Sequence, residues 1–248
     1  MLEEFIVKSN QAETQSEVFD LFEHHLEEYG YNRVVYSLLT DHVSLGLEAQ
    51  HGIFSTYPKD WLDYYQEHDY HLSDPVFRNG YIASKPFLWD DFSRDTKLSA
   101  KAKLVMNEAK EAKLYNGIGI PINGPLFETA GFGIASTDKN IKPDTNTTCL
   151  VNALCMQCHN VITTQLATKE KEKHIQLTQR EQEILLWAAE GKSDSIIADI
   201  LGITHPTVRF HFKNIFRKLQ ANERTLAVVK AIRLGLIVPQ TVKAPYQG

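Results

Sequence analysis

Near the C-terminal end of the chain, apolar residues recur with the spacing of helices that bury one face. Thr178 and Glu181 have the spacing of a capping box and precede such a pattern, which predicts a first helix over residues 179–190. Ser193 is placed to cap a second helix, which ends at Gly202. The predicted apolar stripe of this second helix contains Ile196, Ile197, Ile200 and Leu201.

A third helix is predicted over residues 204–219. Pro206 falls in its first turn, where the missing N–H would have had no intrahelical partner. One face of this helix is apolar and carries Val208, Phe212, Ile215 and Leu219. Another face is basic and carries Arg209, Lys213 and Arg217. Asn222 opens a fourth predicted helix, so the segment is a four-helix module that contains a helix-turn-helix, a DNA-binding motif.

The preceding part of the chain mixes helical and strand patterns. Helices are predicted from Thr14, over residues 99–113 and, around the three cysteines, over residues 149–161. Strands are predicted over residues 33–40, 117–122 and 131–137. Helices that flank a small antiparallel sheet form an α/β/α sandwich, so the expected fold class is α+β with an all-α C-terminal domain. Such a sandwich often encloses a small molecule between its sheet and helices.

Charge divides the 248-residue chain into the same two parts. The whole chain has a net charge of −5, whereas residues 169–248 carry thirteen Lys or Arg and eight Asp or Glu, a net charge of +5 that leaves −10 for residues 1–168. A basic part attracts DNA and an acidic part repels it. We therefore expect a sensor domain over residues 1–168, a linker over residues 169–175 and a DNA-binding domain over residues 176–248.

Composition and sequence signals narrow the class of protein. With 43% hydrophobic and 23% charged residues, the chain is typical of a globular protein. It shows neither a signal peptide nor an apolar run long enough for a membrane span, so a cytoplasmic protein is expected. No nucleophile with a paired base is evident, so we expect no enzyme.

Cys155, Cys158 and His159 have the spacing of a covalent haem site or a redox pair. Such haem is attached outside the cytoplasm, and the motif lies in an apolar helical pattern, so packing in a core is the favoured interpretation. A haem or redox protein is the remote alternative, and neither a cofactor nor a metal is expected.

The C-terminal segment resembles the LuxR-type regulators of bacterial quorum sensing. The matching positions are Leu177-Thr178-Gln179-Arg180-Glu181, Trp187, Gly191-Lys192-Ser193, Thr207-Val208, His211, Asn214, Lys218-Leu219, Arg224-Thr225 and Gly235-Leu236-Ile237. Ile196 departs from this pattern, because the family usually has a glutamate there. We interpret the departure as a lost surface contact or cap that leaves the fold intact.

The resemblance makes the basic face of the third helix a candidate DNA-reading surface, whereas the charge pattern alone would suit a solvated face equally well. The residues placed to reach base edges are Arg209, Phe210 and Lys213, with Thr207, Asn214 and Arg217 beside them. The residues at helix starts, which we expect to hold phosphates, are Lys192, Ser193, Arg224 and Thr225.

An aromatic segment marks a candidate ligand site in the N-terminal part. Pro58 suits the first turn of a helix with an aromatic residue at every fourth position. These aromatic residues are Tyr57, Trp61 and Tyr65. By spacing alone, a packed core stripe is the favoured interpretation. Asp74 directly before Pro75 is likewise typical of a helix N-cap.

The same residues resemble the acyl-homoserine-lactone-binding domain of the LuxR family. Its ligand-contact pattern is matched by Tyr57, Trp61, Tyr65, Asp74-Pro75, Trp89 and Gly117. The resemblance implies that the Asp74 carboxylate accepts the ligand amide N–H, that the Trp61 indole donates to the lactone carbonyl and that the Tyr57 hydroxyl donates to the acyl carbonyl. It implies that Tyr65 and Trp89 wall the pocket. Because a buried polar group left unpaired costs about 1–3 kcal/mol, these contacts select the head group.

The acyl tail needs only apolar volume, which we expect from Val35, Leu39, Val76, Val105 and Leu114. Many family members place a Ser or Thr hydroxyl on the strand at residues 131–136. Depending on the register, this chain offers Ile134 or Ser136 there, and Ser136 is the candidate ligand contact. If Ile134 faces the ligand instead, a 3-oxo or 3-hydroxy group loses one partner.

These expectations describe a quorum-sensing transcription regulator. An N-acyl-homoserine lactone stabilises the sensor domain by binding its folded state. The homodimer then presents two recognition helices to two-fold-symmetric double-stranded DNA, and an activator would also contact RNA polymerase. A regulator of the same architecture that answers another small molecule, or none, is the alternative.

Overall fold

The computed structural model describes residues 2–42, 45, 47–93, 97–124, 128–167 and 175–239. The chain divides into two compact units, Met1–Lys171 and Glu172–Gly248. The expected linker lies outside the described residues except for Ile175. Among the described helices, none combines the length and the apolar composition that crossing a bilayer requires.

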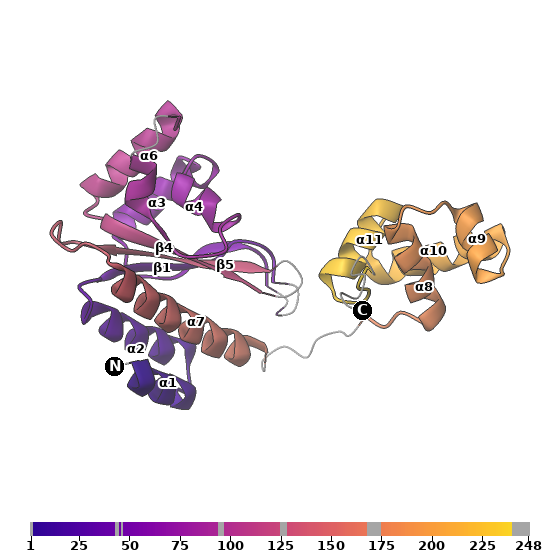
Figure 1. The fold of residues 1–248 in the computed structure, drawn as a ribbon, viewed down its shortest axis with the longest axis horizontal. Helices are drawn as coiled ribbons and strands as arrows, with labels where there is room; N and C mark the ends of the chain where they lie inside the picture. Colours follow the sequence, from indigo (N-terminus) through magenta and orange to yellow (C-terminus); the bar gives the residue numbers. More distant parts are fainter. Residues whose placement is uncertain are drawn as a thin grey trace, which may run out of the picture. The chain divides into compact units, whose positions relative to one another are not determined.

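An antiparallel sheet forms the middle layer of the N-terminal unit, with five strands in the order β2-β1-β5-β4-β3 (Figure 1). The strands are β1 Arg33–Leu38, β2 Gln50–Ser55, β3 Phe87–Leu88, β4 Tyr115–Asn123 and β5 Thr129–Ser136. The sequence predicts β1, β4 and β5, with ends shifted by one or two residues. It does not predict β2, which mixes polar residues with Gly52, or β3, which has only two residues.

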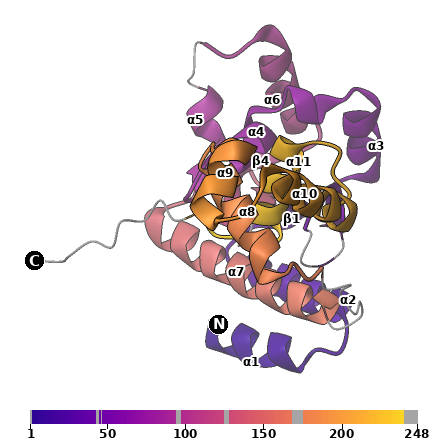
Figure 2. The ribbon, with the colours of Figure 1, turned by 90° about the vertical axis from the view of Figure 1, so that its right-hand side faces the viewer.

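Three helices cover one face of this sheet (Figures 1 and 2). They are α1 Leu2–Gln11, α2 Gln15–Glu27 and α7 Thr145–Ala167. The core between them and the sheet includes Phe22, Tyr36, Phe132, Ile134 and Leu154, none more than 2% exposed. Cys155 and Cys158 of α7 belong to this core, and burial raises the pKa of both thiols. The two cysteines are free and pack as small apolar residues.

Short helices cover the opposite face of the sheet, as both ribbon views show (Figures 1 and 2). They are α3 Lys59–Glu67, the 3-10 turn η2 Tyr70–Leu72, α4 Pro75–Gly80, α5 Trp89–Ser93 and α6 Ala100–Glu111. A second core lies on this side and includes Trp61, Tyr65, Tyr70, Trp89, Val105 and Leu114. The predicted α/β/α sandwich is therefore confirmed. Pro58 is the N-cap of α3 rather than a residue of its first turn.

The C-terminal unit is all-α, as predicted. Its helices are α8 Gln179–Ala189, α9 Asp194–Leu201, α10 His205–Leu219 and α11 Arg224–Arg233. The capping box at the start of α8 is complete, because the Thr178 side chain accepts from the Glu181 N–H and the Glu181 carboxylate accepts from the Thr178 N–H at 2.8 Å. Ser193 caps α9, and Thr204 caps α10. The predicted apolar face of α10 packs in the core of this unit.

Two expectations for this unit are wrong. The fourth helix begins at Arg224 with Glu223 as its N-cap, two residues later than Asn222 suggested. In α9, Ile197 is 0% exposed, but Ile196 and Ile200 are 45% and 44% exposed. Successive residues of a helix point about 100° apart. The side of α9 that packs against the other helices therefore includes Ile197, while Ile196 and Ile200 point toward solvent.

Candidate ligand pocket and nucleic-acid interface

A pocket lies between the sheet and the helices α3 to α6. Together with the solvent space at its open side it encloses about 700 Å³. Its lining includes eight of the nine ligand-binding candidates, namely Tyr57, Trp61, Tyr65, Asp74, Val76, Trp89, Val105 and Leu114. Val35 and Leu39, expected along the acyl tail, also line it. Sheet strands and the four helices α3 to α6 thus bring together residues that are far apart in the sequence.

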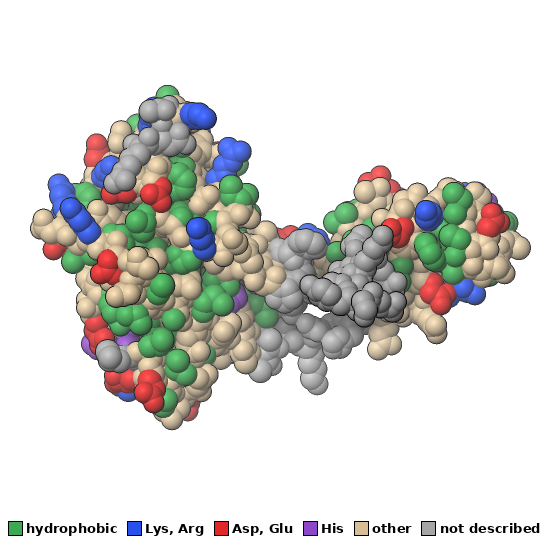
Figure 3. Space-filling view, viewed as in Figure 1, with side chains coloured by type: hydrophobic (Ala, Val, Ile, Leu, Met, Phe, Trp, Pro, Cys, Tyr) green, Lys and Arg blue, Asp and Glu red, His purple; other side chains and the backbone are tan. Residues whose placement is uncertain are grey.

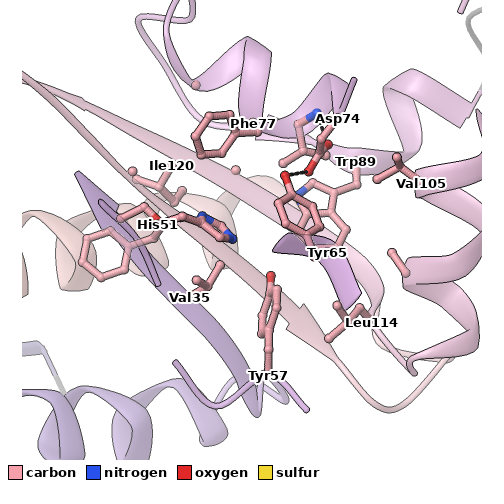
Figure 4. Close-up of a pocket in the computed structure, with 18 of the residues that line it drawn as sticks. Val35, His51, Tyr57, Tyr65, Asp74, Phe77, Trp89, Val105, Leu114 and Ile120 are labelled. Atoms are coloured by element: carbon pink, nitrogen blue, oxygen red, sulfur yellow. Dashed lines mark hydrogen bonds between the residues drawn. The ribbon is translucent and has the colours of Figure 1, made fainter. Parts of the chain in front are cut away.

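Asp74 serves both as a helix cap and as a pocket residue. Its Oδ1 accepts a hydrogen bond from the Val76 N–H at 2.7 Å, which caps α4. Its Oδ2 accepts from the Tyr65 hydroxyl at 2.9 Å, as the dashed line in Figure 4 shows. Burial raises the pKa of Asp74, although the hydrogen bonds from Tyr65, Val76 and Phe77 act in the opposite direction. The carboxyl group is therefore held in place before any ligand binds.

Two donors in the pocket have no hydrogen-bond partner among the described residues. They are the Tyr57 hydroxyl and the Trp89 indole N–H, and both atoms are buried. The Tyr57 hydroxyl points into the pocket in Figure 4. A buried donor without a partner destabilises a folded protein by about 1–3 kcal/mol. A ligand oxygen that accepted a hydrogen bond from the donor would remove this penalty. The resemblance gave Trp89 only a wall role, so its open N–H is an additional donor.

Gly117 shapes the pocket through Trp89. A Cβ atom at residue 117 would lie 2.0 Å from the Trp89 ring, much closer than two carbon atoms can approach. Gly117 itself does not line the pocket. Its place in the ligand-contact pattern therefore reflects the space that Trp89 needs.

Ser136 does not line the pocket, contrary to the expectation. It is 1% exposed, and its Oγ accepts from the Asp138 N–H at 3.0 Å. Residues two apart in a strand point to the same face, so Ser136 lies on the same side of the sheet as Ile134. Ile134 packs with α2 and α7, and Ser136 therefore points away from the pocket. The pocket face of β5 carries Gly131, Gly133 and Ala135. Neither register considered from the sequence supplies a hydroxyl there.

Two polar lining residues were missed from the sequence, Ser37 on β1 and His51 on β2. The His51 Nδ1 and the Ser37 Oγ are 2.9 Å apart. The His51 ring stacks on Tyr65, with centroids 5.0 Å apart, and meets Phe77 edge-on. His51 is exposed as a whole residue, but desolvation of its ring, and then nearby His71, lower the pKa of His51 to about 4. Because the pattern of β2 does not predict a strand, no sequence signal placed His51 beside the pocket.

The basic face of α10 is the candidate DNA-reading surface. Arg209, Lys213 and Phe210 are exposed, with Phe210 at 62%. Beside them, the Arg217 guanidinium donates to Asn214 Oδ1 at 3.4 Å, and the Thr207 and Thr204 hydroxyls are 2.8 Å apart. In contrast, the face of the N-terminal unit seen in Figure 3 mixes acidic and basic side chains without a patch of one sign.

The residues expected to hold phosphates differ in their exposure and in their hydrogen bonds within the unit. Ser193 and Thr225 are exposed, and Lys192 is half-buried. The Arg224 guanidinium instead donates to Asp194 Oδ1 at 2.6 Å and to the Lys192 carbonyl, and it lies over the Phe212 ring. Arg224 thus ties the start of α11 to α9 within the unit.

Comparison with known proteins identifies both units. Residues 14–162 match the family profile described as "Autoinducer binding domain", and residues 175–231 match "Bacterial regulatory proteins, luxR family". The chain belongs to the LuxR family. It is 32% identical to the quorum-sensing regulator RhlR of Pseudomonas aeruginosa over 89% of both chains.

Solved structures of LuxR-type proteins share this fold. The crystal structure of Escherichia coli SdiA has a TM-score of 0.72 and 22% identity, covering 96% of this chain and 98% of SdiA. A second SdiA structure, in complex with octanoyl-rac-glycerol, has a TM-score of 0.71 and 22% identity, with 95% and 94% coverage. The protein is therefore a LuxR-family quorum-sensing transcriptional regulator with an autoinducer-binding domain and a DNA-binding helix-turn-helix, and it is not an enzyme. The two cysteines on which the haem or redox alternative rested, Cys155 and Cys158, are free and buried in the core of the N-terminal unit.

Proposed function

We propose that the pocket binds an N-acyl-homoserine lactone and that the liganded protein binds promoter DNA as a homodimer. The observation that carries this proposal is the Asp74 acceptor, positioned in an apolar pocket that also holds the open Tyr57 and Trp89 donors. A ligand with one amide N–H, two carbonyls and an apolar chain has the complementary groups. The pocket's polar groups would select such a head group, because each one left unpaired is costly.

In this proposal Asp74 accepts the amide N–H, Tyr57 donates to the acyl carbonyl and Trp61 donates to the lactone carbonyl. Tyr65 and Trp89 wall the head group, and the open Trp89 N–H is a further donor to a ligand oxygen. The acyl chain lies along Val35, Leu39, Val76, Val105 and Leu114, all of which line the pocket.

The DNA contacts are part of the same proposal. Exposed side chains of α10 read bases, namely Arg209, Phe210 and Lys213, with Thr207, Asn214 and Arg217 beside them. Lys192, Ser193 and Thr225 hold phosphates, and Arg224 supports them through its contacts with Asp194 and the Lys192 carbonyl. Two such helices in a dimer would fit half-sites about one helical turn apart. Because this task requires the chromosome, we place the protein in the bacterial cytoplasm, and an activator would also contact RNA polymerase.

We also propose the functional boundaries as residues 1–168 for the sensor, 169–175 for the linker and 176–248 for DNA binding. The units Met1–Lys171 and Glu172–Gly248 support this division, because each has its own core.

The direct test is to express the protein with a panel of lactones, with octanoyl-rac-glycerol or with no addition, and to identify the retained molecule by mass spectrometry of an organic extract. We expect one lactone to be retained in stoichiometric amount and to strengthen binding to a two-fold-symmetric promoter fragment. Analytical ultracentrifugation of the liganded protein should show a dimer. Retention of octanoyl-rac-glycerol alone would favour the alternative, a regulator of the same architecture with another ligand. Retention of no compound, with equal DNA binding throughout, would overturn the ligand proposal.

A further inference from the structure

The pocket contains a polar pair that recognition of the head group does not use. His51 on β2 and Ser37 on β1 lie side by side in the wall formed by the sheet, where their neighbours include Val35 and Ile120. Figure 4 shows His51 on the side of the pocket near Val35 and Phe77, across from Val105 and Leu114.

The His51 ring is held in one orientation. The Ser37 Oγ accepts a hydrogen bond from the Gly52 N–H at 3.0 Å, so its own hydrogen is free to go to the His51 Nδ1 at 2.9 Å. When the Ser37 hydroxyl donates to Nδ1 in this way, the hydrogen of the neutral ring lies on Nε2. Stacking on Tyr65 and the edge contact with Phe77 fix the plane of the ring. His51 is exposed as a whole residue, but desolvation of its ring against the pocket side chains, followed by the influence of His71, lowers the pKa of His51 to about 4, so the ring is neutral near pH 7.

Tyr65 sets the position of His51 relative to the head group. Its hydroxyl donates to Asp74, and its ring stacks on His51, so one tyrosine side chain separates the two polar groups. The Tyr65 hydroxyl lies 2.9 Å from Asp74 Oδ2 and the His51 ring 5.0 Å from the Tyr65 ring, whereas an amide nitrogen is four bonds from an oxygen on the third acyl carbon and gains a hydrogen bond at each end. An amide held at Asp74 thus brings a 3-position oxygen within reach of His51.

The neighbouring strand offers no competing side chain. The pocket face of β5 carries Gly131, Gly133 and Ala135, so no hydroxyl from this strand reaches the ligand. A 3-oxo or 3-hydroxy group that entered the pocket would need another partner to replace the water it leaves.

We propose that His51 donates a hydrogen bond from Nε2–H to an oxygen on the third carbon of the acyl chain, with Ser37 as the positioning residue. The pocket would then prefer 3-oxoacyl or 3-hydroxyacyl lactones over unsubstituted ones. This inference rests on the proposed function, since it concerns the acyl part of the same ligand.

The test measures dissociation constants of the full-length protein for three lactones of equal chain length, with a 3-oxo group, a 3-hydroxy group or neither. The chain length is the one that binds wild type best. We expect the better oxygenated lactone to bind about 2- to 10-fold more tightly than the unsubstituted one. In His51→Phe, which retains an aromatic ring to stack on Tyr65 but has no N–H, this ratio should fall to about one, with little change for the unsubstituted lactone.

Ser37→Ala is the milder variant, which leaves the imidazole in place and frees its orientation, so the ratio should fall partway. Val105→Ala is the matched control on the opposite wall, and it should weaken all three lactones alike while keeping the ratio. An undiminished ratio in His51→Phe, or no preference in wild type, would overturn the inference and leave the proposed function standing. Failure of all three lactones to bind wild type would overturn both.

Discussion

Replacing Asp74 separates its role as a helix cap from its role in ligand binding. Asparagine is about as good an N-cap as aspartate, so Asp74→Asn can keep the hydrogen bond from the Val76 N–H. Because burial raises the pKa of Asp74, ionisation of this carboxyl destabilises the folded domain once the pH exceeds the pKa it has in the unfolded chain. Asp74→Asn should therefore not lower the free energy of unfolding near pH 7.

Ligand affinity should behave differently. A hydrogen bond to a charged group contributes about 1.5–3 kcal/mol, so loss of the carboxylate acceptor should weaken lactone binding roughly 10- to 150-fold in Asp74→Asn. Asp74→Ala should lose similar affinity and, because it also removes the cap of α4, about 1 kcal/mol of unfolding free energy. Isothermal titration with the retained lactone and urea unfolding measure the two effects separately.

Thr14→Ala is the matched control. Thr14 caps α2 on the other face of the sheet, where its side chain accepts from the Glu17 N–H at 3.2 Å. Thr14→Ala should lower the unfolding free energy by about as much as loss of the α4 cap does, about 1 kcal/mol, and leave the dissociation constant for the lactone unchanged. The isolated residues 174–248 should bind DNA normally, since they lack the pocket. An Asp74→Asn protein that binds lactone within about two-fold of wild type would refute the reasoning and reduce Asp74 to a helix cap.

Three further predictions concern other parts of the chain. Gly117→Ala should displace Trp89 and lower the unfolding free energy by about 1–3 kcal/mol, seen as a shifted urea midpoint and altered tryptophan fluorescence; an unchanged midpoint would contradict the tight fit. Although burial raises it, the pKa of Glu181 is held below its usual value by the ion pair with Lys218. The pair therefore stabilises the fold fully at a pH above the pKa of this carboxyl in the unfolded chain, and this stabilisation is lost as the pH falls through its pKa in the folded protein. Circular dichroism of Glu181→Gln should show a weaker acid dependence, and an identical acid titration would exclude the pair as its source. Phe210→Ala should relax the preference at one base pair by about 1 kcal/mol through loss of contact with a thymine methyl, and a site-selection assay with unaltered base preferences would count against that contact.

The helices of the C-terminal unit could be predicted because their ends depend on near neighbours. The caps Thr178, Ser193 and Thr204 each bond to a backbone N–H three residues along the chain. The start of α11 was misplaced because Glu223 caps it without a side-chain hydrogen bond, so no local signal marks it. Exposure of Ile196 was missed for a different reason, since it depends on how far neighbouring helices reach around α9.

Spacing within one segment predicted local features such as the Asp74 cap of α4, whereas the place of Tyr65 and Asp74 in a ligand site came from the resemblance to the LuxR family. Contacts that depend on strand pairing were not predictable. The face on which Ser136 lies follows from the register of β5 with β1 and β4, which a single strand pattern does not reveal. His51 reaches the pocket through the pairing of β2 with β1, and the polar sequence of β2 hides that strand.

The two glycines of β5 give the pocket a floor of bare backbone with unequal room above it. A methyl group at Gly131 would lie 3.3 Å from Leu39 Cδ1, a contact that a shift of the leucine side chain relieves. A methyl group at Gly133 would lie 2.9 Å from the Tyr57 hydroxyl and 3.0 Å from Val35. A single mutation at residue 131 would therefore shorten the accepted acyl chain while the head-group donors keep their places, whereas one at residue 133 would disturb both. A single substitution at residue 131 would thus be enough for related bacteria to respond to lactones of different acyl-chain length.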